Sequence, residues 1–289
     1  MQTVANVVLL GSLYLLLATG FVLIYRGSRV MNLAYGDTMA LGAYVILLVA
    51  MASHVNWTLA VLLALVIGVL IGAAMYWLFV RPVQDHPVYV PILVTIALGI
   101  LIRTCISLVF TSQNRYLDEV LQIPKYSVSL AHLQINFIDA ALVGTALAYL
   151  LVVALGLRRT SFGIRMEAVA ENADLAALRG ISPAGVLAPV WGIAMIGAVL
   201  AGFFIGVRTT VSPDIWLIGL KGLTPALVGG LSSFRGLVPG CLLVAATEVL
   251  TIQYIDPVLG EVAPFLVMLA VLWVRPWGLA GKPEQIARV

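Results

Sequence analysis

The chain has 289 residues, of which 62% are hydrophobic and only 10% are charged, with a mean hydropathy of +1.08. Soluble domains carry about 25% charged residues, so a water-soluble core of this length is excluded. The formal net charge of +3 does not indicate a nucleic-acid surface, because the basic residues cluster at the ends of apolar runs. These properties predict a protein embedded in a lipid bilayer.

Apolar runs between charged or proline-rich breaks predict the spanning segments. A helix needs about 20 such residues to cross the hydrocarbon, and these runs lack the alternation of a β-barrel strand. The predicted helices cover about residues 4–25, 30–52, 57–80, 88–110, 137–157, 184–207, 216–231, 237–254 and 261–275. We therefore expect one all-α polytopic membrane domain over residues 1–289, with about eight or nine spans. The short, glycine-rich segment 216–231 is either a crossing or a broken or partial helix.

Basic residues define the expected orientation. Eleven of them fall on one side if the amino terminus is outside: Arg26, Arg29, Arg81, Arg158, Arg159, Arg165, Arg179, Arg235, Arg275, Lys282 and Arg288. Arg115, Lys125 and Arg208 are exceptions. The positive-inside rule then places the carboxy terminus in the cytoplasm. The first apolar run has no preceding Lys or Arg and no clear A-x-A site, so we expect it to stay in the mature protein.

The connection over residues 158–183 is too polar to span. Five residues follow the i, i+3, i+4, i+7 spacing of one helical face: Met166, Val169, Ala170, Ala173 and Ala177. Gly180 and Pro183 supply a stop, which predicts one amphipathic helix over about 164–179. Its opposite face carries Glu167, Glu171 and Asp174. That face is either solvated at a membrane surface or covered by a cationic or polar partner.

Polar residues also interrupt the second apolar run. They are Asn32, Tyr35, Asp37 and Thr38, with Gly36 and Gly42 beside them. One interpretation places this segment along a solute path, where irregular backbone is tolerated at membrane depth. The other places it at the water interface after Arg26 and Arg29. The residues alone leave both interpretations open.

Arg103 and Glu248 lie inside predicted spans, where an ionised side chain costs about 2.5–3.5 kcal/mol. Each needs a partner or water, so they either pair with one another, face a conduit, snorkel or satisfy helix packing. Lys221 is interpreted as marking a membrane interface. The three histidines and two cysteines show no metal-ligand or catalytic spacing, so neither a metal site nor an enzyme is expected.

Residues 168–181, AVAENADLAALRGI, resemble the coupling segment of bacterial branched-chain amino acid permeases of the LivH/LivM type, which belong to ABC transporters. Three more stretches match that family in order: VMNLAYGDTMALGAY (30–44), LIGLKGLTPALVGGL (217–231) and VRPWGLAG (274–281). The resemblance covers nearly the whole chain. The sequence departs from the family at Arg165, where a small residue is common, and at Glu167, where a basic one is common.

The resemblance implies a permease subunit of an ATP-driven importer in the bacterial inner (plasma) membrane. It implies ATPase coupling by Ala168, Glu171, Asn172, Ala177 and Gly180, and a path or gate role for the polar residues between Asn32 and Gly42. Expected partners are a second homologous permease subunit, in a heterodimer rather than a homodimer, two cytoplasmic ATPases and an extracytoplasmic solute-binding protein, but no nucleic acid. The chain has no G-x-x-x-x-G-K-[ST] loop, so ATP and Mg are expected on the ATPases and no cofactor on this chain.

The implied solutes are branched-chain or other neutral amino acids. Related small polar solutes such as urea or a short amide, which similar permeases handle, are the alternatives. An alternative of another class is a secondary transporter or channel driven by an ion gradient, with Asp37, Arg103 or Glu248 in its conduit. A third is a purely structural membrane subunit. The coupling segment favours the importer over both.

Overall fold

The structure is a computed structural model that describes residues 1–53, 56–87, 89–111, 113–123, 127–130 and 133–281. Eight helices in this part of the chain are long and apolar enough to cross a membrane. The long helices are α1 Gln2–Ser28, α2 Tyr35–Ser53, α3 Trp57–Met75, α4 Tyr89–Phe110, α6 Phe137–Arg159, α9 Pro183–Arg208, α12 Leu237–Tyr254 and α13 Pro257–Val274. The predicted polytopic helical bundle is confirmed.

Shorter elements connect the long helices. A π-helical turn η1 (Tyr76–Val80) and a 3-10 turn η2 (Arg81–Val83) extend α3, and α5 (Leu117–Leu121) follows α4. Strands β1 (Ser127–Leu130) and β2 (Leu133–Asn136) pair antiparallel before α6. Helices α7 (Ser161–Glu171) and α8 (Ala173–Leu178) link α6 to α9. Between α9 and α12 lie η3 (Pro213–Ile215), α10 (Trp216–Lys221), α11 (Leu223–Gly229) and η4 (Phe234–Gly236).

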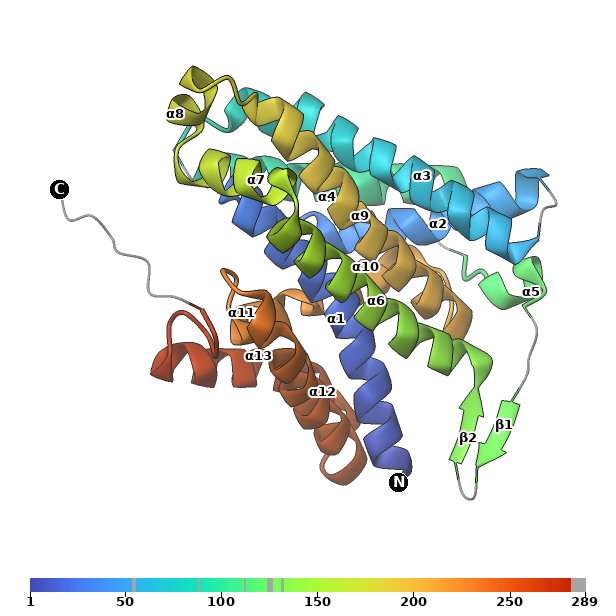
Figure 1. Ribbon diagram of the computed structural model, residues 1–289. Helices are drawn as coiled ribbons and strands as arrows, with labels where there is room; N and C mark the ends of the chain where they lie inside the picture. The colour runs from blue at the N-terminus through green and yellow to red at the C-terminus, as the bar shows by residue number, and fades with distance from the viewer. Residues whose placement is uncertain (54–55, 88, 112, 124–126, 131–132, 282–289) are drawn as a thin grey trace.

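Helices α1, α2 and α9 form the centre of the bundle. In their most apolar stretches 78%, 72% and 78% of the residues are buried, against 28% in α3, α4 and α6 and 17% in α13. Helix α1 runs between two groups, with α2, α3, α4 and α9 on one side and α11, α12 and α13 on the other (Figure 1). The outer helices thus present their apolar faces to lipid or to partner helices.

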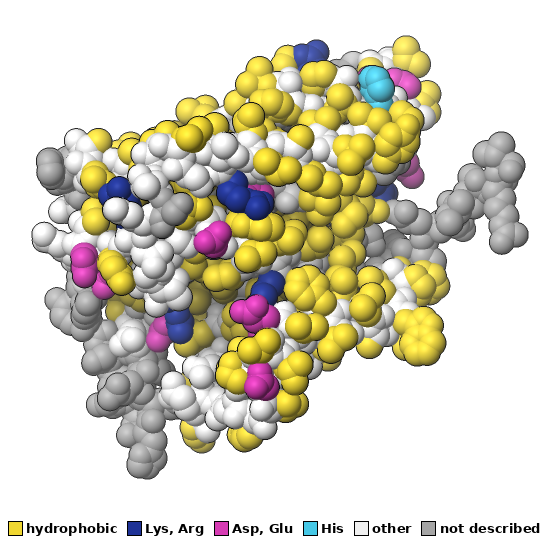
Figure 2. All heavy atoms as spheres, turned by 180° about the vertical axis from the view of Figure 1, so that it is seen from behind, with side chains coloured by type: hydrophobic (Ala, Val, Ile, Leu, Met, Phe, Trp, Pro, Cys, Tyr) yellow, Lys and Arg dark blue, Asp and Glu magenta, His cyan; other side chains and the backbone are white. Residues whose placement is uncertain are grey.

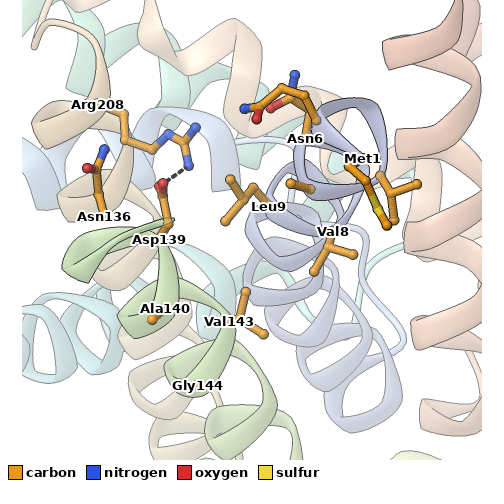
Figure 3. A pocket seen from close by; sticks show the side chains of 13 residues that line it. Met1, Asn6, Val8, Leu9, Asn136, Asp139, Ala140, Val143, Gly144 and Arg208 are labelled. Atoms are coloured by element: carbon orange, nitrogen blue, oxygen red, sulfur yellow. Dashed lines mark hydrogen bonds and ion pairs between the residues drawn. The ribbon is translucent and has the colours of Figure 1, made fainter. Parts of the chain in front are cut away.

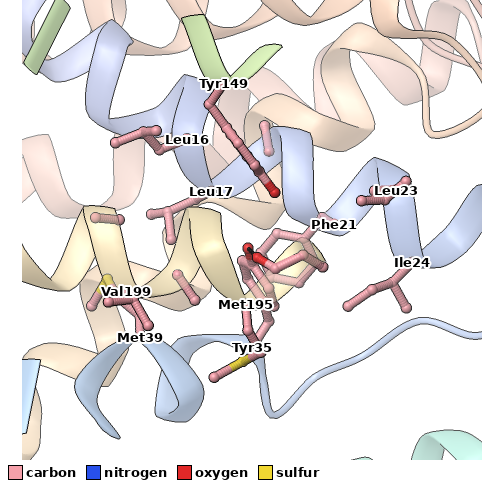
Figure 4. Packing of buried hydrophobic residues seen from close by; sticks show 14 of the residues in the cluster. Leu16, Leu17, Phe21, Leu23, Ile24, Tyr35, Met39, Tyr149, Met195 and Val199 are labelled. Carbon is pink, nitrogen blue, oxygen red and sulfur yellow. Dashed lines mark hydrogen bonds between the residues drawn. The ribbon is translucent and has the colours of Figure 1, made fainter. Parts of the chain in front are cut away.

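Two buried tyrosines bind α2 and α6 to α9. The hydroxyl of Tyr35 on α2 donates to the carbonyl of Ala194 at 2.6 Å, and that of Tyr149 on α6 donates to the carbonyl of Ile193 at 2.9 Å. Figure 4 shows both rings pointing into the space between α1 and α9, next to Met195. A polar group in this core is stable only with a partner, and the α9 carbonyls supply one.

Helix α2 begins later than predicted, at Tyr35 instead of residue 30. Arg29 ends α1 in the left-handed conformation, with φ 55°, and the Asn32 side chain accepts a hydrogen bond from the amide of Ala34 at 3.1 Å. This local bond competes with helix formation, because it gives the backbone another partner. Asn32 therefore lies in a compact turn before the helix, and Tyr35, Asp37 and Thr38 lie in the first turn of α2.

The short seventh span is broken into α10 and α11, as one of the two sequence interpretations proposed. Pro225 has no amide hydrogen and cannot donate to the carbonyl of Lys221 as a continuous helix requires. The hydroxyl of Thr224 donates to that carbonyl instead, at 2.8 Å. At the junction, a Cβ on Gly222 would lie 2.5 Å from Cβ of Leu17, so α1 fits only a glycine here.

The connections gather at two opposite ends of the bundle (Figure 1). At one end lie α7 and α8, together with residues 275–281, which return to α11 through a bond from Leu279 N to Val228 O at 2.8 Å. At the other end, Arg115 and Val211 exchange backbone hydrogen bonds of 3.0 and 2.8 Å. These links hold the ends of neighbouring spans in register.

Candidate functional site

The predicted coupling helix over 164–179 is wrong as a continuous helix, because it breaks at Asn172. That residue has extended backbone, and its side-chain oxygen accepts a hydrogen bond from Leu175 N at 2.9 Å. Asparagine is a preferred N-cap, so it ends α7 and starts α8. The break shifts the helical phase, so that Ala176 is buried and Ala177, predicted on the inner face, is exposed.

The two parts of this segment differ in their surroundings. Helix α7 buries Met166 and Val169 against the bundle. Helix α8 exposes Leu175 and Leu178, the latter 82% accessible. Ala168 is half-buried, Glu171 is exposed, and Gly180 ends the segment with φ 79°, which confirms the predicted stop. The α7–α8 segment thus has an anchored half and an exposed, partly apolar half.

Arg26 connects α7 to the centre of the bundle. Its guanidinium lies 2.8 Å from the carboxylate of Glu167 on α7 and 5.2 Å from the ring centroid of Phe234 in η4. For the face that carries Glu167, the sequence left open either a solvated surface or a cationic or polar partner. The structure gives that carboxylate a partner on α1, 141 residues away in the chain.

The polar residues from Asn32 to Gly42 are buried within the chain instead of lining a water interface. Asn32, Tyr35, Asp37 and Thr38 are each at most 3% exposed. Thr38 donates back to the carbonyl of Tyr35 at 2.8 Å, and a Cβ on Gly42 would lie 2.8 Å from Cα of Val199. This segment is the contact surface of α2 for its neighbours.

One of those neighbours is α10. A Cβ on Gly36 would lie 2.4 Å from the carbonyl oxygen of Trp216, and a Cβ on Gly219 would lie 2.6 Å from Cα of Gly36. Backbones approach this closely in lipid only where small residues face one another. The broken span is therefore seated directly on the polar segment of α2.

Asp37 and Arg103 form an ion pair between α2 and α4, with Nε 3.0 Å from Oδ1. The guanidinium of Arg103 also stacks on Trp216 of α10, with Cζ 3.4 Å from the ring centroid. The predicted alternative that Arg103 pairs with Glu248 is wrong. Packing of α4 against α2 brings Arg103 to Asp37, while Glu248 lies on α12.

Glu248 has two other partners. Its carboxylate accepts a hydrogen bond from the hydroxyl of Tyr14 on α1 and pairs with the ammonium of Lys221 on α10 at 3.1 Å. The ammonium of Lys221, a residue interpreted from the sequence as an interface marker, thus turns to a buried carboxylate. Tyr14, Lys221 and Glu248 form a three-helix cluster that we call the carboxylate cluster.

The carboxylate cluster lies in the wall of a cavity of about 520 Å³. Polar lining residues include Asn6, Tyr14, Arg208, Lys221, Glu248 and Glu261. A second cavity of about 1110 Å³ shares Asn6, Leu9 and Arg208 with it, so the two adjoin. Figure 3 shows the larger cavity between α1 and α6, with Arg208 and Asp139 paired at 2.7 Å on its rim.

The sequence-predicted residues thus fall into three places. Ala168, Glu171, Asn172, Ala177 and Gly180 lie on the α7–α8 segment. The polar α2 segment joins Arg103, and Glu248 lies apart in the cavity wall. Sequence reasoning missed Tyr14 and Trp216, which look like ordinary apolar-run aromatics. Nothing local in the sequence marks Tyr14 as a partner of Glu248, because the two residues are 234 positions apart.

A helical membrane bundle with a broken span, intramembrane ion pairs and a polar projection has the architecture of the membrane component of a transporter. The family model for the permease component of branched-chain amino acid transport systems matches residues 3–272. The chain belongs to this family of ABC transporter permeases.

Curated relatives agree along the whole length. The chain is 28% identical to the high-affinity branched-chain amino acid transport system permease protein LivH of Escherichia coli (strain K12), over 98% of this chain and 96% of that protein. It is 25% identical to permease protein BraD of Pseudomonas aeruginosa over the same shares, and 25% identical to a probable LivH of Methanocaldococcus jannaschii over 95% and 90%.

Proposed function

We propose that this chain is the membrane-spanning subunit of an ATP-driven importer for neutral amino acids, with branched-chain amino acids as the leading solutes. The family match and the names of the relatives support the solute class. The α7–α8 segment supports the energy source, because it offers an exposed helix with Leu175 and Leu178 at one end of the bundle. This exposed helix is the observation that carries the proposal.

The end of the bundle with α7 and α8 faces the cytoplasm. Most arginines of the described chain gather there, including Arg26, Arg158, Arg159 and Arg179, and the positive-inside rule assigns such an end to the cytoplasm. The amino terminus then lies outside. The ATPases, which hold ATP and Mg, bind α8 from the cytoplasm, and the solute-binding protein docks at the opposite end.

Force passes from α8 into the bundle through α7. The ion pair between Glu167 and Arg26 joins α7 to α1, and Ser182, whose hydroxyl accepts from Gly185 N at 3.2 Å, caps α9 directly after α8. Helices α1 and α9 are the most buried in the bundle. Drawing the α7–α8 segments of two permease subunits together would therefore tilt the central helices as rigid bodies.

The polar segment of α2 serves as the packed support of a gate. Its side chains are buried, so Asn32, Tyr35, Asp37 and Thr38 act by holding α2 against its neighbours instead of contacting solute. Gly36 and Gly42 permit the close seating of α10 and α9. The broken α10–α11 span is the moving part of this gate. The polar segment of α2 either holds that span in place or lets it move.

Co-purification with ATPases tests the proposal. The full chain is expressed with the homologous permease subunit and the ATPases of its own cell and isolated in mild detergent. We expect Leu178→Ser to lose the ATPases, because it removes apolar surface from the contact. The control Ile255→Ser, at the opposite end and 71% exposed against 82% for Leu178, should retain them.

Two outcomes would overturn this proposal. ATPase binding that is indifferent to Leu178→Ser and to removal of the Asn172 cap would show that α8 is not the contact. Solute flux by the isolated chain that follows an ion gradient would favour a secondary transporter. The carboxylates of Asp37 and Glu248 would then be the candidate ion sites.

A further inference from the structure

The cavity beside the carboxylate cluster has the composition of a site for a zwitterion. Two basic and two acidic side chains line it, Arg208 and Lys221 against Glu248 and Glu261, so their formal charges cancel. Most of the remaining wall is aliphatic, with Leu9, Leu10, Leu13, Leu142 and Ile218 among its residues. A volume of about 520 Å³ lies in the usual range of about 300–1,000 Å³ for small-molecule sites.

Stability alone does not explain the ion pair in this wall. Burying Lys221 and Glu248 carries a desolvation cost that their attraction repays poorly, and well-packed apolar residues often serve a fold as well or better. Intramembrane charges that face a cavity characteristically mark substrate paths. The residue Glu248 is 5% exposed, yet both Glu248 and Lys221 line the cavity.

We propose that this cavity binds the transported amino acid itself, by exchange of partners within the ion pair. The α-carboxylate of the solute takes the place of Glu248 on Lys221, and the α-ammonium binds the carboxylate of Glu248, which the Tyr14 hydroxyl continues to hold. The aliphatic side chain packs on the leucines of α1. Every charge keeps an opposite charge beside it during the exchange.

The surrounding geometry supports an approach from the outer end of the bundle. The larger adjoining cavity opens around the first residues of α1, with the Arg208–Asp139 pair at its rim (Figure 3). Seen from behind the bundle, several Lys and Arg side chains lie next to Asp and Glu side chains (Figure 2). A solute in the cavity meets charges of both signs, from Arg208 and Lys221 and from Glu248 and Glu261.

This inference rests on the proposed function and narrows its solute class. Urea, short amides and simple carboxylates lack one or both of the charges that the cluster offers. The free amino group and the free carboxylate are each required. The cluster thus favours free amino acids with aliphatic side chains over these other small solutes.

Cysteine protection tests the site in the complete transporter, assembled with its partners in lipid nanodiscs. Cys105 and Cys241 are replaced by serine and alanine, and Ile218→Cys, one helical turn before Lys221 on α10, reports access to the cavity. Labelling by a water-soluble maleimide is measured with L-leucine, 4-methylpentanoate, isoamylamine and isovaleramide. We expect leucine alone to slow labelling, because it alone carries both charges.

Two variants separate binding from folding. Glu248→Gln should weaken leucine protection about tenfold or more, since it removes a charge-assisted hydrogen bond. The double variant Lys221→Met with Glu248→Met keeps an uncharged, packed cluster that folds, and it should also lose protection. Glu119→Gln is the same chemical change on exposed α5, outside the cavity. Leucine should protect this variant as well as it protects the parent.

Three results would overturn the inference. If isovaleramide protects as well as leucine, the cavity does not recognise the charged groups of the solute. Absence of protection in a transporter that imports leucine with ATP would place the solute elsewhere and leave the proposed function standing. Labelling in the isolated chain but not in the assembled transporter, whatever the solute, would show that a partner helix fills the cavity.

Discussion

Arg103 holds Asp37 and Trp216 at the same time, with its Nε 3.0 Å from the carboxylate and its Cζ 3.4 Å from the centre of the indole ring. The carboxylate belongs to α2, the guanidinium to α4 and the indole to α10. One side chain therefore fastens the broken span to the polar segment of α2. The contact makes the position of α10 depend on a charge in α4.

Removing one charge of this pair should destabilise the protein. Breaking a buried ion pair costs about 3–5 kcal/mol, but the Arg103 side chain is 31% exposed, so we expect the lower end of that range or less for Asp37→Asn. The melting temperature of the detergent-solubilised chain measures the effect. Asp37→Asn combined with Arg103→Met should recover most of the loss, because no unpaired charge remains.

Arg103→Lys offers a second comparison at the same pair. Lysine keeps the charge near Asp37 but loses the planar stack on Trp216, which is worth about 0.5–2 kcal/mol. If Arg103→Lys melts like the parent, the indole contact contributes nothing to the seating of α10.

The contact of Gly36 with α10 should reject any side chain. A Cβ there would lie 2.4 Å from a backbone oxygen, so Gly36→Ala must displace α10 and should cost about 1–3 kcal/mol or more. Gly156→Ala on α6 is the control, because nothing lies within 4 Å of its Cβ and alanine favours a helix by up to about 1 kcal/mol. Thermal melting should fall for the first and stay level or rise for the second.

The sequence predicts the spans well, because each long apolar run can be recognised from its own residues without knowledge of the packing. It also contains the signal for the α7–α8 break, since Asn172 is a strong N-cap residue followed by a short helical run. The continuous stripe of small and apolar residues concealed that signal. A helix that restarts after an extended residue changes phase, which moved Ala177 outward and Ala176 inward.

The ion pairs could not be predicted in the same way. Asp37 and Arg103 are 66 residues apart, and Tyr14 and Glu248 are 234 residues apart. Composition shows that an intramembrane charge needs a partner but not which helix will supply it. The choice depends on helix packing, and glycines such as Gly36 and Gly219 set how closely α2 and α10 approach.

The Asn172 cap should matter more for coupling than for the membrane fold. Asn172→Ala removes the bond to Leu175 N and should destabilise α8 by about 1 kcal/mol, while Asn172→Ser retains a capping oxygen. Hydrogen exchange over residues 173–179 should accelerate about fivefold for alanine and little for serine. Equal exchange in both variants would mean that partner or lipid contacts, not the cap, hold α8.

The link between Arg26 and Glu167 should behave as a mechanical contact of low thermodynamic weight. The Glu167 side chain is 66% exposed, so Glu167→Gln should change stability by less than about 1 kcal/mol. In the assembled transporter we nevertheless expect ATP hydrolysis to continue while solute uptake falls. The exchanged pair Arg26→Glu with Glu167→Arg should restore part of that uptake. Full uptake in Glu167→Gln would show that this contact does not transmit movement from α7 to α1.

The central claim is tested most directly by leucine uptake into proteoliposomes that contain this chain, the homologous permease subunit, the ATPases and the solute-binding protein. ATP is supplied on the α7–α8 side and the binding protein on the opposite side. We predict accumulation of leucine that requires ATP and is lost in Leu178→Ser. Accumulation that proceeds without ATP, or that the chain alone achieves with an ion gradient, would contradict the account.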